Sequence, residues 1–224
     1  MLHSLVRFHR APYGTVALTF DGGPDPRWTP QLLRLLRREG VPATFFVMGT
    51  NAARYPGLVR AELRGGDEIG IQTFRPVDLG RQPALVARYE LSLAETALAG
   101  AAGVRTSLLR PAYVATAAQL TDAQLSRIRD ASRAGFLAVL ADRDSQDWQR
   151  PGVAAIVQHS LPQGGRGAII QLHDGGGRRD QSVAAAAVLI SRLREQGYRF
   201  TTVSSLLGAP TRDGMSSAHG FERL

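Results

Sequence analysis

Two residues of this sequence stand where catalytic groups are commonly placed, directly after an apolar run. Asp21 follows the run "TVALTF" and precedes the turn residues "GGP". His173 follows "GAIIQL" and precedes "DGGG". A carboxylate can act as a general base and an imidazole as a general acid, so the pair could carry out acid–base chemistry. A lone aspartate before a turn also serves as a turn cap, so neither residue is decisive alone.

The elements that would position these groups alternate along the chain between short apolar runs and longer amphipathic stretches. Strands are expected within 15–20, 43–49, 67–73, 106–113, 136–144 and 167–174, and helices over 29–40, 55–66, 84–101, 121–135 and 181–197. The segment 198–208 is expected to close the fold. Strands that alternate with helices of this length indicate βαβ units and a parallel sheet. About seven such units favour a closed α/β barrel. A dinucleotide-binding fold is disfavoured, because "FDGGPDP" lacks the G-x-G-x-x-G spacing.

In barrels of this type, the chemistry sits at the C-terminal ends of the strands. The polar residues expected there are Asp21, Gln72, Thr73, Arg110, Tyr113, Asp142, Asp144, Asp147, Trp148, His173 and Asp174. Several polar groups on one face could surround a single substrate, so the constellation carries more weight than any one member.

Composition narrows the classes of function. The chain has 224 residues, a hydrophobic share of 44% and no cysteine, which fits one globular domain and excludes thiolate metal sites. The net charge is +8, and all basic residues are arginines. They are scattered, with the densest group in 34–40, so we expect no nucleic-acid partner.

The expected domain boundaries follow the periodicity. Residues 1–13 form an N-terminal extension without the apolar core of a signal peptide, 14–208 form the barrel, and 209–224 are predicted to be a disordered tail or linker. No apolar run reaches 18 residues, so no membrane insertion by this segment is expected. As written, the chain is expected to be cytoplasmic, and extracytoplasmic if it is a fragment of a membrane protein.

Five motifs together carry a family resemblance. "TFDGGPDP", "GDEIGIQTFRPVDL", "LLRPAY", "DRDSQDWQRPG" and "GAIIQLHDGGG" resemble, in order and spacing, the NodB-type polysaccharide deacetylases of carbohydrate esterase family 4. The resemblance spans residues 14 to about 207 and implies a distorted (β/α)7 barrel, the NodB homology domain. With "GYRFTTVS", it looks closest to deacetylase-like domains that some actinobacterial proteins fuse to a family 2 glycosyltransferase.

The resemblance implies roles for individual residues. Asp21 corresponds to the general base, His173 to the general acid and Arg110 to the arginine that orients the base. Asp147 and Trp148 correspond to the D-W pair beside the acid, and Tyr113 to the aromatic residue that contacts the sugar. In the family a divalent metal, usually zinc, activates water and stabilises the oxyanion.

The three family metal ligands are an aspartate and two histidines, and here these positions hold Gly22, Gln72 and Pro76. We call these three residues the metal positions. Gly22 and Pro76 have no side-chain donor, and Gln72 offers only a neutral amide, so no metal cofactor is expected.

The leading hypothesis is therefore a catalytically impaired, deacetylase-like domain that binds an N-acetylated oligosaccharide or polysaccharide and works beside a glycosyltransferase. The alternative is an active, metal-dependent hydrolase of carbon–nitrogen bonds with a relocated metal site. Candidate ligands for such a site are Asp25, Asp78, Asp142, Asp144 and Asp174. A third possibility is a drifted site with no remaining ligand, so enzyme activity stays open from the sequence.

Overall fold

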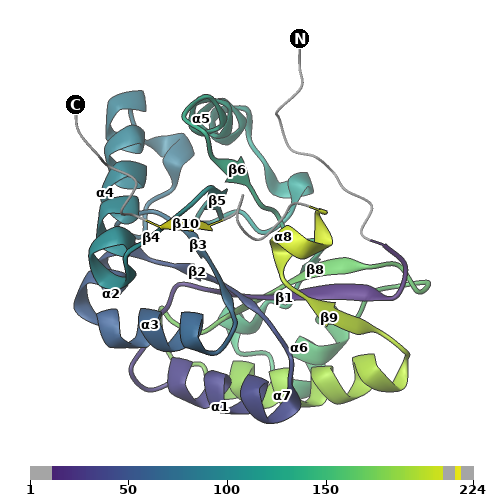
Figure 1. Ribbon diagram of the computed structural model, residues 1–224. Coiled ribbons are helices and arrows are strands. Elements are labelled where there is room, and N and C mark those ends of the chain that lie inside the picture. The colour runs from purple at the N-terminus through teal and green to yellow at the C-terminus, as the bar shows by residue number, and fades with distance from the viewer. Residues whose placement is uncertain (1–11, 209–214, 218–224) are drawn as a thin grey trace.

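The computed structural model describes residues 12–208 and 215–217, and its centre is one eight-stranded parallel sheet (Figure 1). The spatial order is β6-β5-β3-β2-β1-β8-β7, and β9 also pairs with β1. The strands are β1 (Thr15–Asp21), β2 (Thr44–Val47), β3 (Glu68–Ile71), β5 (Leu108–Leu109), β6 (Leu137–Ala138), β7 (Arg143–Asp144), β8 (Ala168–His173) and β9 (Arg199–Thr201).

The sheet curls into a distorted barrel because one chain segment joins its two edges. Strands β6 and β7 are successive pieces of residues 137–144, yet β6 pairs with β5 and β7 pairs with β8. This confirms the predicted α/β fold with a parallel sheet curled into a barrel.

Helices follow most strands and cover the outside of the sheet. They are α1 (Thr29–Glu39), α2 (Gly49–Arg54), α3 (Pro56–Arg64), α4 (Ala84–Ala102), α5 (Asp122–Arg133), α6 (Val153–Ser160), α7 (Asp180–Glu195) and α8 (Val203–Leu206), with 3-10 turns η1 (Leu79–Arg81), η2 (Ala117–Gln119) and η3 (Asp147–Gln149). Figure 1 shows α1 and α7 side by side below the sheet. The expected helix over 55–66 is α3, and a short α2 precedes it because Pro56 starts a new helix.

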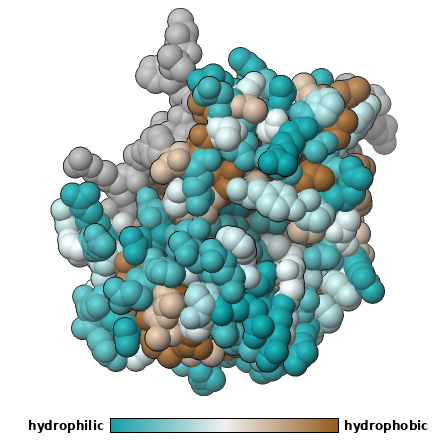
Figure 2. Space-filling view, turned by 180° about the vertical axis from the view of Figure 1, so that it is seen from behind, coloured by the Kyte–Doolittle hydropathy of each residue, from teal (hydrophilic) through white to brown (hydrophobic). Residues whose placement is uncertain are grey.

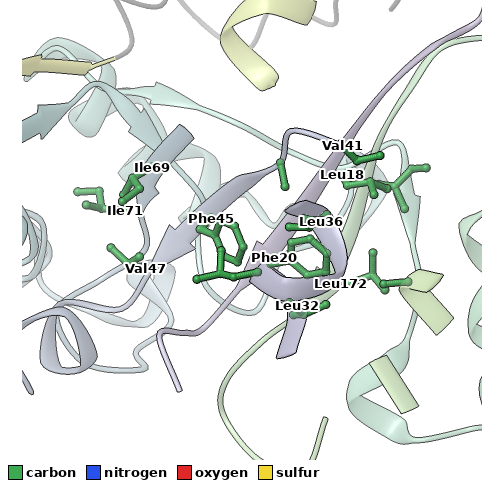
Figure 3. Packing of buried hydrophobic residues seen from close by; sticks show 14 of the residues in the cluster. Leu18, Phe20, Leu32, Leu36, Val41, Phe45, Val47, Ile69, Ile71 and Leu172 are labelled. Atoms are coloured by element: carbon green, nitrogen blue, oxygen red, sulfur yellow. The ribbon is translucent and has the colours of Figure 1, made fainter. Parts of the chain in front are cut away.

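The alternation of side chains along β1 separates two apolar clusters. Val16, Leu18 and Phe20 point outward into the larger cluster, which lies between the sheet and the helices. Figure 3 shows Leu32 and Leu36 of α1 packed beside Phe20. The odd-numbered residues of β1 consequently face the barrel interior.

The barrel interior has an apolar middle and a covered lower end. Its cluster contains Ala17, Phe46, Leu108, Val139, Ile169, Val203 and Leu206. Helix α8 covers the N-terminal end of the strands, where the Val203 backbone N–H donates to Thr44 and that of Ser204 donates to Glu68. The C-terminal ends of the strands lie at the opposite end, which we call the mouth of the barrel.

The tail predicted to be disordered is described only in part. Met215–Ser217 form β10, which pairs in antiparallel fashion with β4 (Val104–Thr106), and the rest of 209–224 lies outside the described residues. Residues 1–11 of the expected extension lie outside them as well.

No helix in the described part of the chain is both long and apolar enough to cross a membrane. Figure 2 shows that hydrophilic residues dominate the face opposite to that of Figure 1, with smaller apolar patches between them.

Candidate active site

Asp21 and His173 meet at the C-terminal ends of two neighbouring strands. They are the last residues of β1 and β8, and the register of this strand pair sets them side by side. Arg110 follows β5, is fully buried, and its Nε lies 3.8 Å from Asp21 Oδ2. The structure thus brings together the three side chains that the sequence nominated for catalysis.

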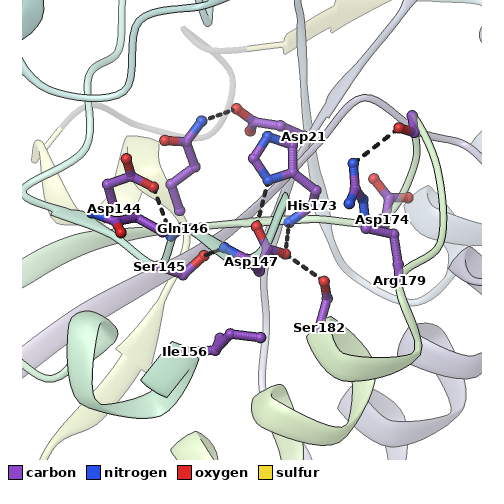
Figure 4. A network of polar contacts seen from close by, with 12 residues as sticks. Asp21, Asp144, Ser145, Gln146, Asp147, Ile156, His173, Asp174, Arg179 and Ser182 are labelled. Atoms are coloured by element: carbon purple, nitrogen blue, oxygen red, sulfur yellow. Dashed lines mark hydrogen bonds and ion pairs between the residues drawn. The ribbon is translucent and has the colours of Figure 1, made fainter. Parts of the chain in front are cut away.

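His173 is held by two hydrogen bonds to Asp147, which Figure 4 shows. The His173 Nδ1–H donates to Asp147 Oδ1 at 2.7 Å, and the His173 backbone N–H donates to Oδ2 at 2.9 Å. The Ser182 hydroxyl of α7 also donates to Oδ2, at 2.5 Å. We call Asp147, His173 and Ser182 the acid half of the site. Since Nδ1 carries the proton, Nε2 is the ring nitrogen that can serve a ligand.

In the acid half, Asp147 and His173 each favour the charged form of the other. Burial would raise the pKa of Asp147, but the hydrogen bonds and charge of His173, together with Ser182, outweigh burial and hold this pKa below its ordinary value. Burial would lower the pKa of His173, but the hydrogen bond and charge of Asp147 outweigh it, and this pKa is raised. His173 therefore keeps its proton to higher pH, as a general acid requires.

Asp21 lies in a different environment, with one oxygen engaged and the other without a partner. Gln171 Nε2 donates to Asp21 Oδ2 at 2.6 Å, whereas Asp21 Oδ1 is buried and makes no hydrogen bond with the described residues. Arg110 Nη2 donates to Thr19 instead, at 3.0 Å, and its Nε and Nη1 make no hydrogen bond there. The guanidinium lies 4.7 Å from the centroid of the Phe46 ring. We call Asp21, Arg110 and Gln171 the base half.

Hydrogen bonds join the motif that contains Gly23 to the motif that contains Asp174. The Gly23 backbone N–H donates to Asp174 Oδ1 at 3.0 Å, and the Thr29 hydroxyl donates to Oδ2 at 2.5 Å. A Cβ at Gly23 would lie 2.0 Å from this carboxylate, so only glycine fits. Burial raises the pKa of Asp174 to about 7, aided by the charge of Asp21 and opposed by the Thr29 hydrogen bond.

The two aromatic candidates are exposed at the surface. Tyr113 is 71% exposed and Trp148 56% exposed, unusual values for large aromatic side chains. Tyr113 adopts a left-handed backbone conformation with φ of 64°, and its hydroxyl donates to the Pro76 carbonyl at 3.0 Å. Strained backbone in a non-glycine residue is found often at functional sites.

The metal positions offer few donor atoms for a metal ion. Gly22 has φ of +84° and contacts the Gly175 backbone, Pro76 is exposed, and Gln72 is buried with a neutral amide. No group of three His, Cys, Asp or Glu side chains within the described ranges could hold a metal ion. The residues present do not fit a three-ligand zinc site.

Several contacts of the site were not foreseen from the sequence. Gln171 and Ser182 both bind the predicted carboxylates, and Arg179 donates to the carbonyls of Gly175 and Gly176. The position of Gln171, two residues before His173 on a strand, was a usable signal because it places both side chains on one face. Ser182 and Arg179 gave no such signal.

Comparisons with known proteins agree with this geometry. The family model "Polysaccharide deacetylase" matches residues 8–128. A peptidoglycan-N-acetylglucosamine deacetylase of Bacillus cereus is 40% identical over 195 residues, covering 86% of this chain and 87% of the relative.

Solved structures give the same result. A peptidoglycan N-acetylglucosamine deacetylase in complex with a benzamide compound superposes with a TM-score of 0.81 at 30% identity, covering 90% of this chain and 92% of that chain. A Bacillus anthracis protein described as a pseudoenzyme of carbohydrate esterase family 4 superposes with a TM-score of 0.75. It is 20% identical and covers 89% of this chain and 66% of that chain, so it supports the fold alone.

Proposed function

The chain belongs to the polysaccharide deacetylase family, and on this premise we propose that it binds N-acetylated glycans without the family's metal-dependent hydrolysis. The family is generally metal-dependent. The observation that carries the proposal is the donor set at the metal positions, where Gly22, Gln72 and Pro76 offer one neutral amide in place of three ligands.

The local contacts at these positions support the same conclusion. Gly22 lies against the backbone of Gly175, and the carbonyl of Pro76 accepts from Tyr113. Asp21 is fully buried, and its Oδ2 is engaged by Gln171. The loss of metal chemistry removes several kcal/mol of transition-state stabilisation, and each ~1.4 kcal/mol is a factor of ten in rate.

A relocated metal site has little support, because each candidate carboxylate serves its own loop. Asp25 accepts from backbone N–H groups at the start of α1, and Asp78 does so at η1. Asp142 accepts from the Ile169 backbone and Asp144 from that of Gln146. Asp174 is occupied by Gly23 and Thr29, as described above. These carboxylates stabilise turns and loops.

A glycan groove is supported by the exposed aromatic side chains at the mouth. Tyr113 and Trp148 present ring faces on which sugar rings can stack, and His173 can donate to a carbonyl oxygen. The B. cereus relative acts on peptidoglycan N-acetylglucosamine, so an N-acetylglucosamine polymer is the ligand class we propose.

The likeness to glycosyltransferase fusions adds a partner to the proposal. A glycan-binding domain beside a glycosyltransferase could hold the growing polymer near the transferase. Co-purification of the two proteins from the native host would test this partnership.

The functional test is acetate release from an N-acetylglucosamine oligomer by the folded chain, with added zinc or cobalt and with chelator. We expect no release under any of these conditions. In parallel, calorimetry with the same oligomer should give binding that Trp148→Ala weakens about tenfold, corresponding to ~1.4 kcal/mol for a stacked ring. Leu85→Ala, which removes an exposed apolar side chain of α4, is the matched control. Metal-dependent release would contradict the proposal, and unchanged affinity of Trp148→Ala would remove the groove.

A further inference from the structure

Gln171 occupies a position from which it controls the base half of the site. On β8 it faces the barrel interior one layer below His173, and the strand register sets it opposite Thr19 of β1. From there its side chain reaches Asp21 on the neighbouring strand, and only 6% of Gln171 is exposed. An amide that donates to a buried carboxylate at 2.6 Å makes a short, charge-assisted hydrogen bond.

This hydrogen bond takes the carboxylate oxygen nearest to Arg110. Arg110 Nε stands 3.8 Å from the same Asp21 Oδ2, within ion-pair range but beyond a hydrogen bond. The guanidinium keeps two nitrogens without a hydrogen bond to the described residues, while its third binds Thr19. A bidentate arginine–carboxylate pair would satisfy both partners better. Gln171, and not Arg110, therefore makes the hydrogen bond to this carboxylate oxygen.

The same hydrogen bond accompanies a fully buried orientation of Asp21. Neither carboxylate oxygen is available at the mouth, since Oδ2 is bonded to Gln171 and Oδ1 has less than 1 Å² of accessible surface. A general base must come within about 3 Å of the atom whose proton it removes. In the orientation described here, Asp21 presents no accessible, unengaged oxygen for that contact.

We propose that Gln171 is a positioning residue that holds Asp21 in an orientation unfit for proton transfer. Consequently, restoring the three metal ligands would leave the site impaired until Gln171 is also replaced. This inference rests on the proposed function, because it assumes that the chain has lost metal-dependent hydrolysis.

The hydrogen bond itself can be tested in the unaltered chain by NMR. One Gln171 side-chain amide proton should exchange with solvent at least tenfold more slowly than those of Gln163, an exposed glutamine. Asp21→Ala, in a folded sample, should abolish this protection. Equal exchange of Gln171 and Gln163 in the unaltered chain would overturn the proposal whatever the metal experiments give.

The functional consequence is tested in the variant Gly22→Asp/Gln72→His/Pro76→His, to which Gln171→Met is then added. Methionine keeps the length of glutamine but cannot donate a hydrogen bond. Gln163→Met in the same background is the matched surface control.

Two measurements distinguish the effect of Gln171 on Asp21 from the effect of the metal positions on zinc binding. Calorimetry with zinc alone should give dissociation constants for the two variants within about twofold of each other. Acetate release from an N-acetylglucosamine oligomer should rise at least tenfold in kcat on Gln171→Met, with KM little changed. If both variants bind zinc and have equal kcat, the proposed role of Gln171 is overturned. Absence of zinc binding to the triple variant would instead contradict the claim that the metal positions are the missing part, and the NMR result alone would then decide on Gln171.

Discussion

The acid half and the base half of the site meet where β1 pairs with β8, but their two carboxylates differ in the hydrogen bonds that they accept. In the acid half, Asp147 accepts three hydrogen bonds from His173 and Ser182. In the base half, Asp21 keeps one oxygen and Arg110 two nitrogens without hydrogen bonds to the described residues. Buried polar groups without partners are costly.

This difference in hydrogen bonding matches the places where the chain departs from the family pattern. The acid half is held by side chains of η3, β8 and α7, and none of them is a metal position. The base half borders Gly22, where the family has a charged ligand and its metal. The carboxylate of Asp147 accepts from both of its neighbours in the acid half, whereas the carboxylate of Asp21 accepts from Gln171 and leaves one oxygen unpaired among the described residues.

The largest effect expected is the loss of stability on breaking the acid half. Asp147→Ala would leave His173 without its buried partner, so the free energy of unfolding should fall by about 3–5 kcal/mol in urea denaturation. Gln72→Ala, at a metal position with no side-chain hydrogen bond to the described residues, should lower it by about 1 kcal/mol or less. Similar losses in both variants would erase the distinction between the halves.

A second prediction concerns pH and uses Asp174, whose carboxylate accepts hydrogen bonds from Gly23 and Thr29. Its pKa is raised from 3.8 to about 7 by burial, so the folded chain binds a proton that the unfolded chain releases. This contribution to stability is fully present below pH ~4 and is lost as the pH rises to about 7, at up to ~1.4 kcal/mol per pH unit.

Asp174→Asn cannot release that proton. The decline in the free energy of unfolding between pH 5 and pH 7 should therefore be shallower by about 1 kcal/mol per unit in the variant. Parallel stability curves for the two proteins would show that Asp174 titrates normally.

The smallest effect expected tests whether Gly22 is more than a missing ligand. Its φ of +84° is unfavourable for any residue with a Cβ, although the nearest atoms lie at 3.6 Å, so Gly22→Ala should destabilise the chain by about 1 kcal/mol. Gly57→Ala, in α3 with open space around it, should be neutral or slightly stabilising. Equal effects of the two substitutions, measured by thermal unfolding, would mean that the backbone at Gly22 relaxes without strain.

The fold and the residues of the site could be predicted from the sequence more fully than the contacts between those residues. Asp21 and His173 could be assigned to strand ends because apolar runs stop there, and parallel strands bring such ends to one edge. The strand 136–144 was expected as one piece, but the chain changes partner between β6 and β7 to close the barrel. That change depends on pairing with distant strands and has no local signal.

The contacts of Gln171 and Ser182 depend on strand register and helix placement across long sequence separations. Gln171 lies 150 positions from Asp21, and Ser182 lies 35 from Asp147. Composition and periodicity specify the face on which a side chain lies but not which neighbour it reaches. The roles of Asp21, Arg110, Tyr113 and Trp148 therefore stay predictions until they are tested by substitution.

The most direct test of the central claim is a calorimetric titration of the chain with zinc, after His3, His9 and His219 outside the described residues are replaced by alanine. We expect no saturable one-to-one binding, because the metal positions offer no set of three ligands. One-to-one binding at micromolar or lower dissociation constant would contradict it and would show that other side chains have rebuilt a metal site at the mouth of the barrel.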